Sequence, residues 1–193
     1  MSRLTPLVLH EMTPEQRAVA DEIIADPRRR ISGPFIPWLR NPEMADLAQK
    51  LGFVMRFHTT LPPRLSELAI LVAARFWRCD FAWTAHLQPA ADAGITEETI
   101  QAIAAGQLPN PVAADEATLL AFCNELLDHR AVSDRTYQAA LGILGERGVV
   151  ELVALLGYYT LAAMTMQAFE IRPPEELARL QPEQQTPMTS KAG

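Results

Sequence analysis

The chain has 193 residues, which is enough for one domain with a substantial core. Hydrophobic residues make up 49% of it and charged residues 21%, as in an ordinary soluble globular protein. The net charge of −6 argues against a general nucleic-acid binder, because such proteins carry a basic face. Two cysteines are too few for a disulfide framework, and residues 1–10 lack the apolar run of a signal peptide. We expect a soluble cytoplasmic protein.

Helix-start signals recur in the N-terminal part. Thr13 to Gln16 combines a capping threonine, a proline at the first helical position and a capping-box glutamine, so a helix is predicted from there to about Ala25. Ser32 to Pro37 is a turn-rich connector. Asn41-Pro42 starts a second helix, on which apolar residues recur at helical spacing: Leu47, Leu51, Val54 and Met55.

The most apolar run of the first half follows a break at His58 to Pro63. From Leu65 to Trp77 little polar face remains, which predicts a helix buried nearly all round. Helical sequence then continues to Gly94, which ends it as a C-terminal cap. Thr96 starts a short helix that ends at Gly106.

Three more helices are predicted in the second half. Asp115 to His129 is amphipathic, and Ser133 caps the helix that follows, with Gly145 and Gly148 at its end. Val149 to Phe169 is long and apolar. Its uncharged part is at the lower edge of membrane-spanning length, but no cluster of positive charges flanks it. We therefore predict a helix buried in the core or at a subunit contact.

The last residues complete the domain prediction. Pro173-Pro174 opens a final short helix, and residues 181–193 are expected to form a disordered tail. No strand pattern with a period of two occurs. Residues 1–180 are therefore predicted to form one all-α domain with about eight or nine helices.

Three side chains that could do chemistry lie in or after the apolar run: Glu67, Cys79 and His86. In one continuous helix Glu67 and His86 would be about 28 Å apart, at 1.5 Å per residue. A bend near residues 77–79 would let Glu67 face the other two. Cys79 would then lie at a helix N-terminus, where the dipole and free N–H groups lower a thiol pKa. Cys79 and His86, seven residues apart, would share a helix face.

These residues resemble the carboxymuconolactone decarboxylase / alkylhydroperoxidase D (AhpD-like) family. Leu61 to Leu71 is similar to the family's first active-site helix with its glutamate, and Cys79 to His86 is similar to the second. Ala93 to Ile100 is similar to the helix start that follows. The core of the resemblance covers about residues 61–106, with a weaker match at 151–159. It implies an all-α, AhpD-like multihelical bundle that assembles as a trimer or hexamer.

The resemblance implies two chemistries. The AhpD branch uses a Cys-x-x-Cys pair with a glutamate and a histidine; Glu67, Cys79 and His86 match, but Ala82 occupies the second cysteine position. What remains is a single-cysteine peroxidase, in which Cys79 attacks a peroxide and an external thiol resolves the sulfenic acid. The decarboxylase branch acts on a small lactone acid, with His86 and Glu67 as an acid–base pair. Many members carry Glu where this chain has Ala82.

Each of these residues also has a structural interpretation. His86 could be a hydrogen-bonded core histidine, and Glu67 could pair with Arg64 or Arg75. Cys79 could be a small buried hydrophobe. A helical oligomer with a decayed, non-catalytic site is therefore a third hypothesis.

Our leading prediction is a decarboxylase-like enzyme acting on a small organic acid or lactone. Trp83, Phe81 and His58 are predicted to shape the substrate pocket. No cluster of residues has metal-ligand spacing and no Gly-rich phosphate loop occurs, so no metal or cofactor is expected. The expected partners are a small-molecule substrate and further copies of the chain, with no nucleic acid and no membrane.

Overall fold

The computed structural model describes residues 2–5, 7–25, 30–110 and 112–173. The helix predicted after Pro173 and the tail predicted from residue 181 lie outside these residues. All regular secondary structure in the described part of the chain is helical, and this part holds no strand. The prediction of an all-α fold with eight or nine helices is confirmed.

The helical elements follow one another with short connections. In chain order they are η1 (Leu9–Glu11), α1 (Pro14–Ala25), α2 (Phe35–Trp38), α3 (Pro42–Phe57), α4 (Pro63–Phe76), α5 (Asp80–Asp92), α6 (Glu97–Ala104), α7 (Ala114–Asn124), the π-helical turn η2 (Glu125–His129) and α8 (Asp134–Ala168). Gly145 interrupts α8 with φ 67° and ψ 173°, so α8 is two helices joined at this residue. The predicted connector Ser32 to Pro37 contains the start of the short helix α2.

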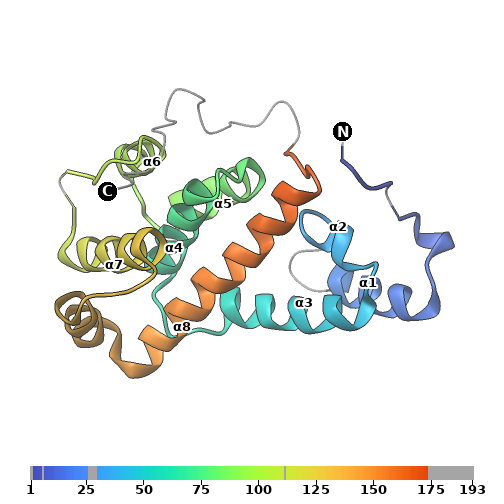
Figure 1. The fold of residues 1–193 in the computed structure, drawn as a ribbon, viewed down its shortest axis with the longest axis horizontal. Coiled ribbons are helices and arrows are strands. Elements are labelled where there is room, and N and C mark those ends of the chain that lie inside the picture. Colours follow the sequence, from blue (N-terminus) through green and yellow to red (C-terminus); the bar gives the residue numbers. More distant parts are fainter. Residues whose placement is uncertain (1, 6, 26–29, 111, 174–193) are drawn as a thin grey trace, which may run out of the picture.

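The core is built around α4. This helix packs against α5, α6, α7 and α8, and the second half of α8 runs diagonally through the middle of the molecule (Figure 1). α1 and α2 lie at one end with α3, which reaches across to α8, and α6 and α7 lie at the other end (Figure 1). Leu65, Leu68 and Leu71 of α4 are fully buried, which confirms the predicted buried helix.

Side-chain caps begin four of the helices as the sequence predicts. Thr13 and Gln16 form a reciprocal capping box, with a 3.0 Å hydrogen bond from the Thr13 N–H to Gln16 Oε1. Asn41, Thr96 and Ser133 each accept a hydrogen bond from the N–H three residues on. Because these caps are local, the sequence alone is enough to place these helix starts.

The predicted bend between α4 and α5 is present. Arg78 adopts a left-handed conformation with φ 49°, and the Cys79 N–H donates back to the Ala74 carbonyl at 2.8 Å. From α8, Nε2 of Gln167 donates to the carbonyl oxygens of Trp77 and Arg78 at 2.8 and 2.7 Å. The bend is therefore held by a helix that lies 90 residues further along the chain.

Two helices carry rows of exposed apolar side chains. On α3, Leu47, Leu51 and Val54 are 64%, 45% and 42% exposed, although Met55 of the same helix is buried. A similar row on α8 consists of Val150, Val153, Leu161 and Met164. The spacings of 4 and 3 residues on α3, and of 3, 8 and 3 residues on α8, place the members of each row on one helix face.

α8 is the one helix in the described ranges whose length and hydropathy would allow it to cross a bilayer. Half of its most apolar window is buried inside the fold. Core helices of soluble proteins pass the same test, so this agrees with the predicted buried helix.

Candidate active site

The bend brings Glu67 and His86 into contact. Nδ1 of His86 lies 2.6 Å from Oε2 of Glu67, and the side chains are only 6% and 14% exposed. α4 carries the carboxylate and α5 carries the imidazole, so the two packed helices meet through these functional groups. Arg64, which the sequence offered as a structural partner for Glu67, instead pairs with Asp115 and Glu116.

Tyr159 on α8 completes a chain of three side chains. Its phenol oxygen lies 3.0 Å from Nε2 of His86, and the two rings meet edge to face with centroids 5.1 Å apart. Tyr159 is 73 residues from His86, so only the tertiary fold identifies it.

The hydrogen-bond partners indicate which His86 nitrogen carries the proton. An ionised Glu67 only accepts hydrogen bonds, so Nδ1 of His86 is the donor in that pair. In the neutral imidazole Nε2 then accepts from the Tyr159 hydroxyl. The arrangement joins a carboxylate, an imidazole and a phenol in a line along which a proton can move.

His86 and Tyr159 open onto a cavity of about 180 Å³. Phe81, Ala82 and Ala85 of α5 form its wall beside the imidazole, and Tyr158, Ala162 and Met166 of α8 form the wall beside the phenol. Ala82 takes up little space here, so the position where the family carries an acid or a thiol is a small apolar surface.

A third wall comes from the N-terminal segment. Arg30, Ser32, Pro34 and Phe35 all line the cavity. The segment passes so close to α5 that a Cβ on Gly33, which has φ +58°, would lie 2.9 Å from Phe81. Glycine is required there both for the backbone conformation and for the close approach. The residues that precede the family resemblance therefore help to form the site.

The charged side chains of the cavity are basic. Arg30 and Arg56 line it, and none of the described lining residues is acidic. Arg56, in the last turn of α3, is half-buried and lies over the Phe57 ring at 5.2 Å. Since the chain as a whole carries a charge of −6, this local excess of positive charge selects for an anionic ligand.

Cys79 lies apart from this arrangement. It precedes α5, is 2% exposed and is not among the residues that line the cavity. Burial raises the pKa of its thiol, outweighing the N–H groups of Ala82 and Phe81, which act in the opposite direction. The expectation that the helix N-terminus lowers this pKa is therefore wrong, because desolvation of the thiolate is the larger effect. Cys123 is fully buried in the core, and burial raises its pKa to about 12.

Of the three residues predicted to shape the pocket, one lines the cavity and two do not. Phe81 lines the cavity, whereas Trp83 is packed in the core and does not line it. His58 is exposed and its ring lies against Phe53 with centroids 4.9 Å apart, also away from the cavity. Among the described residues no group of His, Cys, Asp and Glu side chains could hold a metal ion.

The sequence matches a known family model over its central part. Residues 42–122 match the model of the carboxymuconolactone decarboxylase family. This range spans α3 to most of α7 and contains Glu67 and His86 but not Tyr159 or the N-terminal wall. None of the curated proteins matches the chain in sequence.

Several solved structures share the fold, and two illustrate the likeness. One is a protein of unknown function from Agrobacterium tumefaciens, described as an antioxidant defence protein AhpD; it is 16% identical, with a TM-score of 0.66 over 75% of this chain and 100% of that chain. The other is the alkylhydroperoxidase AhpD core of an uncharacterized peroxidase-related protein from Ralstonia eutropha JMP134. It is 13% identical, with a TM-score of 0.74 over 91% and 93% of the two chains. At these identities the likeness is one of fold.

Proposed function

Residues 42–122 place this chain in the carboxymuconolactone decarboxylase / AhpD-like family, and on that premise we propose that it is a decarboxylase-like enzyme acting on a small organic acid or lactone. The observation that carries the proposal is the line of hydrogen bonds from Glu67 through His86 to Tyr159 at the edge of a basic cavity. The cavity arginines would hold the carboxylate of such a substrate.

The chemistry follows from the position of the groups. Loss of CO2 leaves an electron pair on the substrate carbon, and the Tyr159 hydroxyl donates its proton to that carbon. The resulting phenolate takes a proton from Nε2 of His86, which reacts as the imidazolium. In that form Nε2 donates to the Tyr159 oxygen instead of accepting from its hydroxyl, and Glu67 stabilises the positive charge. A water molecule then returns a proton to His86, and the hydroxide that it leaves combines with the released CO2 to form bicarbonate. No redox partner is needed in this sequence of steps.

The alternatives have less support. A single-cysteine peroxidase needs an accessible thiolate, whereas Cys79 is buried outside the cavity and its pKa is raised. The support for the peroxidase alternative is that the two similar structures are named as AhpD-like proteins. A decayed site would be expected to have Glu67 and His86 apart or packed without a cavity, and here they are in contact beside one.

A panel of small lactone acids and keto acids tests the proposal through CO2 release and through deuterium uptake at the substrate carbon. Turnover of at least one acid is expected, and His86→Gln and Glu67→Gln should each lower it by about 10²- to 10⁴-fold. His10→Gln, at an exposed position, is the matched control. Unchanged turnover in the His86 variant, or no reaction with any acid, would contradict the proposal.

We also propose that the protein is a cytoplasmic homo-oligomer. The support for assembly is the pair of exposed apolar rows on α3 and α8. Each row lies on one helix face, which suits helix-to-helix packing against another copy of the chain.

A further inference from the structure

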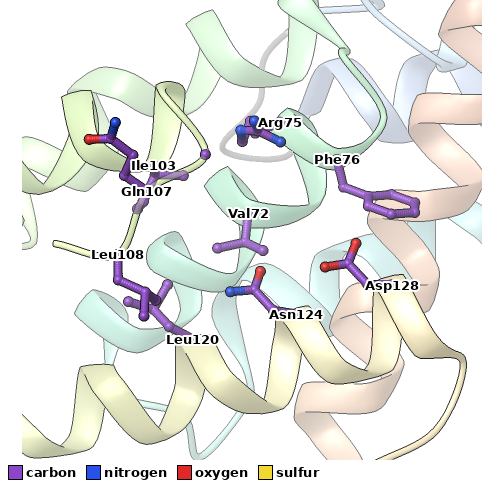
Figure 2. Close-up of a pocket in the computed structure, with 10 residues that line it drawn as sticks. Val72, Arg75, Phe76, Ile103, Gln107, Leu108, Leu120, Asn124 and Asp128 are labelled. Atoms are coloured by element: carbon purple, nitrogen blue, oxygen red, sulfur yellow. The ribbon is translucent and has the colours of Figure 1, made fainter. Parts of the chain in front are cut away.

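A second cavity lies on the other side of α4, between α6, α7 and η2. It has a volume of about 170 Å³, equal to about six water molecules at roughly 30 Å³ each. Val72 forms its floor, and Ile103, Leu108 and Leu120 form an apolar wall (Figure 2). Arg75, Gln107, Asn124 and Asp128 surround this surface with polar groups (Figure 2).

Arg75 is held at one edge of this cavity. Its Nε donates to the carbonyl of Ala104 at 3.4 Å, and its guanidinium lies against Gly106, where a Cβ would collide with it. Gly106 also has φ +69°, so glycine is favoured there twice over. Within the described part of the chain Arg75 forms no ion pair, so its remaining N–H groups are available to a ligand.

Asp128 supplies the opposite charge from η2. This π-helical turn is fixed from its other side, because Glu125 accepts hydrogen bonds from the Ser133 N–H at 2.8 Å and the Thr136 hydroxyl at 2.6 Å. π-Helical turns are rare and are often found at functional sites. The Asp128 carboxylate faces the hollow but forms no ion pair with Arg75 (Figure 2).

An adjoining hollow of about 360 Å³ extends the apolar part. It shares Leu108, Leu120, Asn124 and Asp128 with the first cavity and continues along Pro109, Val112, Ala117 and Ala121. A guanidinium and a carboxylate thus face one space without touching, beside an aliphatic channel.

We propose that this cavity binds a free aliphatic α-amino acid. Its carboxylate would pair with Arg75, its ammonium group with Asp128, and its side chain would lie along Leu108 and Leu120. Both charges of a zwitterion are then neutralised by side chains of opposite sign. The amides of Gln107 and Asn124 can donate to or accept from the same groups. This site is independent of the proposed decarboxylase function.

Calorimetric titration of the full chain with leucine tests the proposal, with isocaproate (no ammonium group) and isoamylamine (no carboxylate) as probes. Saturable leucine binding is expected, at least tenfold tighter than either probe. Arg75→Gln and Asp128→Asn should each weaken it at least tenfold. Arg78→Gln removes an exposed guanidinium nearby that does not line the cavity, and should leave binding unchanged.

Amide NMR shifts on the wild-type chain locate the ligand without relying on a variant that folds. Leucine should move the resonances of residues 106–108 and 124–128, and should do so equally in His86→Gln. The proposal is overturned if leucine gives no saturable signal, if isocaproate binds as tightly, or if the shifts centre on His86.

Discussion

At the residue scale, the distinguishing feature is His86, whose two ring nitrogens contact two different groups, a carboxylate and a phenol. Glu67 lies 2.6 Å from Nδ1 of His86 and Tyr159 lies 3.0 Å from Nε2. The carboxylate fixes the ring and the phenol extends its reach into the cavity. In the proposed reaction Tyr159 would therefore carry the proton to the substrate, and His86 would replace the proton on Tyr159.

Tyr159→Phe tests this division of roles. The ring is kept, so the fold should persist with a loss of about 1 kcal/mol for one buried hydrogen bond. Turnover of the acid should fall by about 10²-fold or more, with little change in KM, because the lost group acts on the transition state. Steady-state kinetics and urea unfolding measure the two effects. Turnover equal to that of the wild type would show that His86 reaches the substrate without Tyr159.

The Cys79 thiol should be unreactive at neutral pH. Its pKa is raised above the ordinary 9.0, so the thiol is protonated at pH 7 and the thiolate appears only as the pH rises past about 9. Alkylation by iodoacetamide, followed by mass spectrometry, should be slow at pH 7 and accelerate up to about tenfold per pH unit. Cys79→Ser leaves only Cys123, with a pKa of about 12, as the control. Rapid alkylation at pH 7 would revive the peroxidase hypothesis.

At the element scale, the sequence predicts what is local and misses what is distant. The caps at Thr13, Asn41, Thr96 and Ser133 depend on neighbours three residues away, and all four are present. The α4–α5 bend contains no Gly or Pro, so no local pattern predicts it. The sequence shows only that Glu67 and His86 can meet if the chain bends there. Gln167 of α8 holds that bend, and no local pattern reveals such a contact.

Two helical glycines give opposite predictions for the same substitution. A Cβ on Gly52 of α3 would collide with the Tyr158 phenol, whereas nothing lies within 4 Å of a Cβ on Gly157 of α8. Gly52→Ala should lower the free energy of unfolding by about 1–3 kcal/mol through overpacking. Gly157→Ala should raise it by about 0.5–1 kcal/mol, as expected for Ala in an open helix position. Urea unfolding compares them, and equal effects would show that Tyr158 does not pack on Gly52.

At the scale of the whole molecule, the exposed rows on α3 and α8 show why helical spacing alone is ambiguous. Apolar residues at such spacing pack either into their own core or against another molecule, and the pattern is the same in both cases. Leu47, Leu51 and Val54 point away from the core. Only the position of α3 against α8 and α1 decides which face remains outside.

Leu47→Glu combined with Leu51→Glu tests the proposed assembly. Placing charge on the row should dissociate the oligomer, because buried unpaired carboxylates are costly. Light scattering coupled to size exclusion should then give a mass near 21.4 kDa, that of one chain. Leu9→Glu, at an exposed leucine outside both rows, should leave the assembly intact. A wild-type mass of one chain at micromolar concentration would refute assembly through this face.

The wall formed by residues 30–35 has an evolutionary consequence. It lies outside the family match at 42–122 and contains none of the three hydrogen-bonded residues Glu67, His86 and Tyr159. In the proposed enzyme, Arg30 and the rest of this wall would thus be encoded apart from the proton-transfer residues, whereas the second cavity arginine, Arg56, lies within the family match. If the proposed function holds, substitutions in residues 30–35 would change which acid binds and leave Glu67, His86 and Tyr159 unaltered.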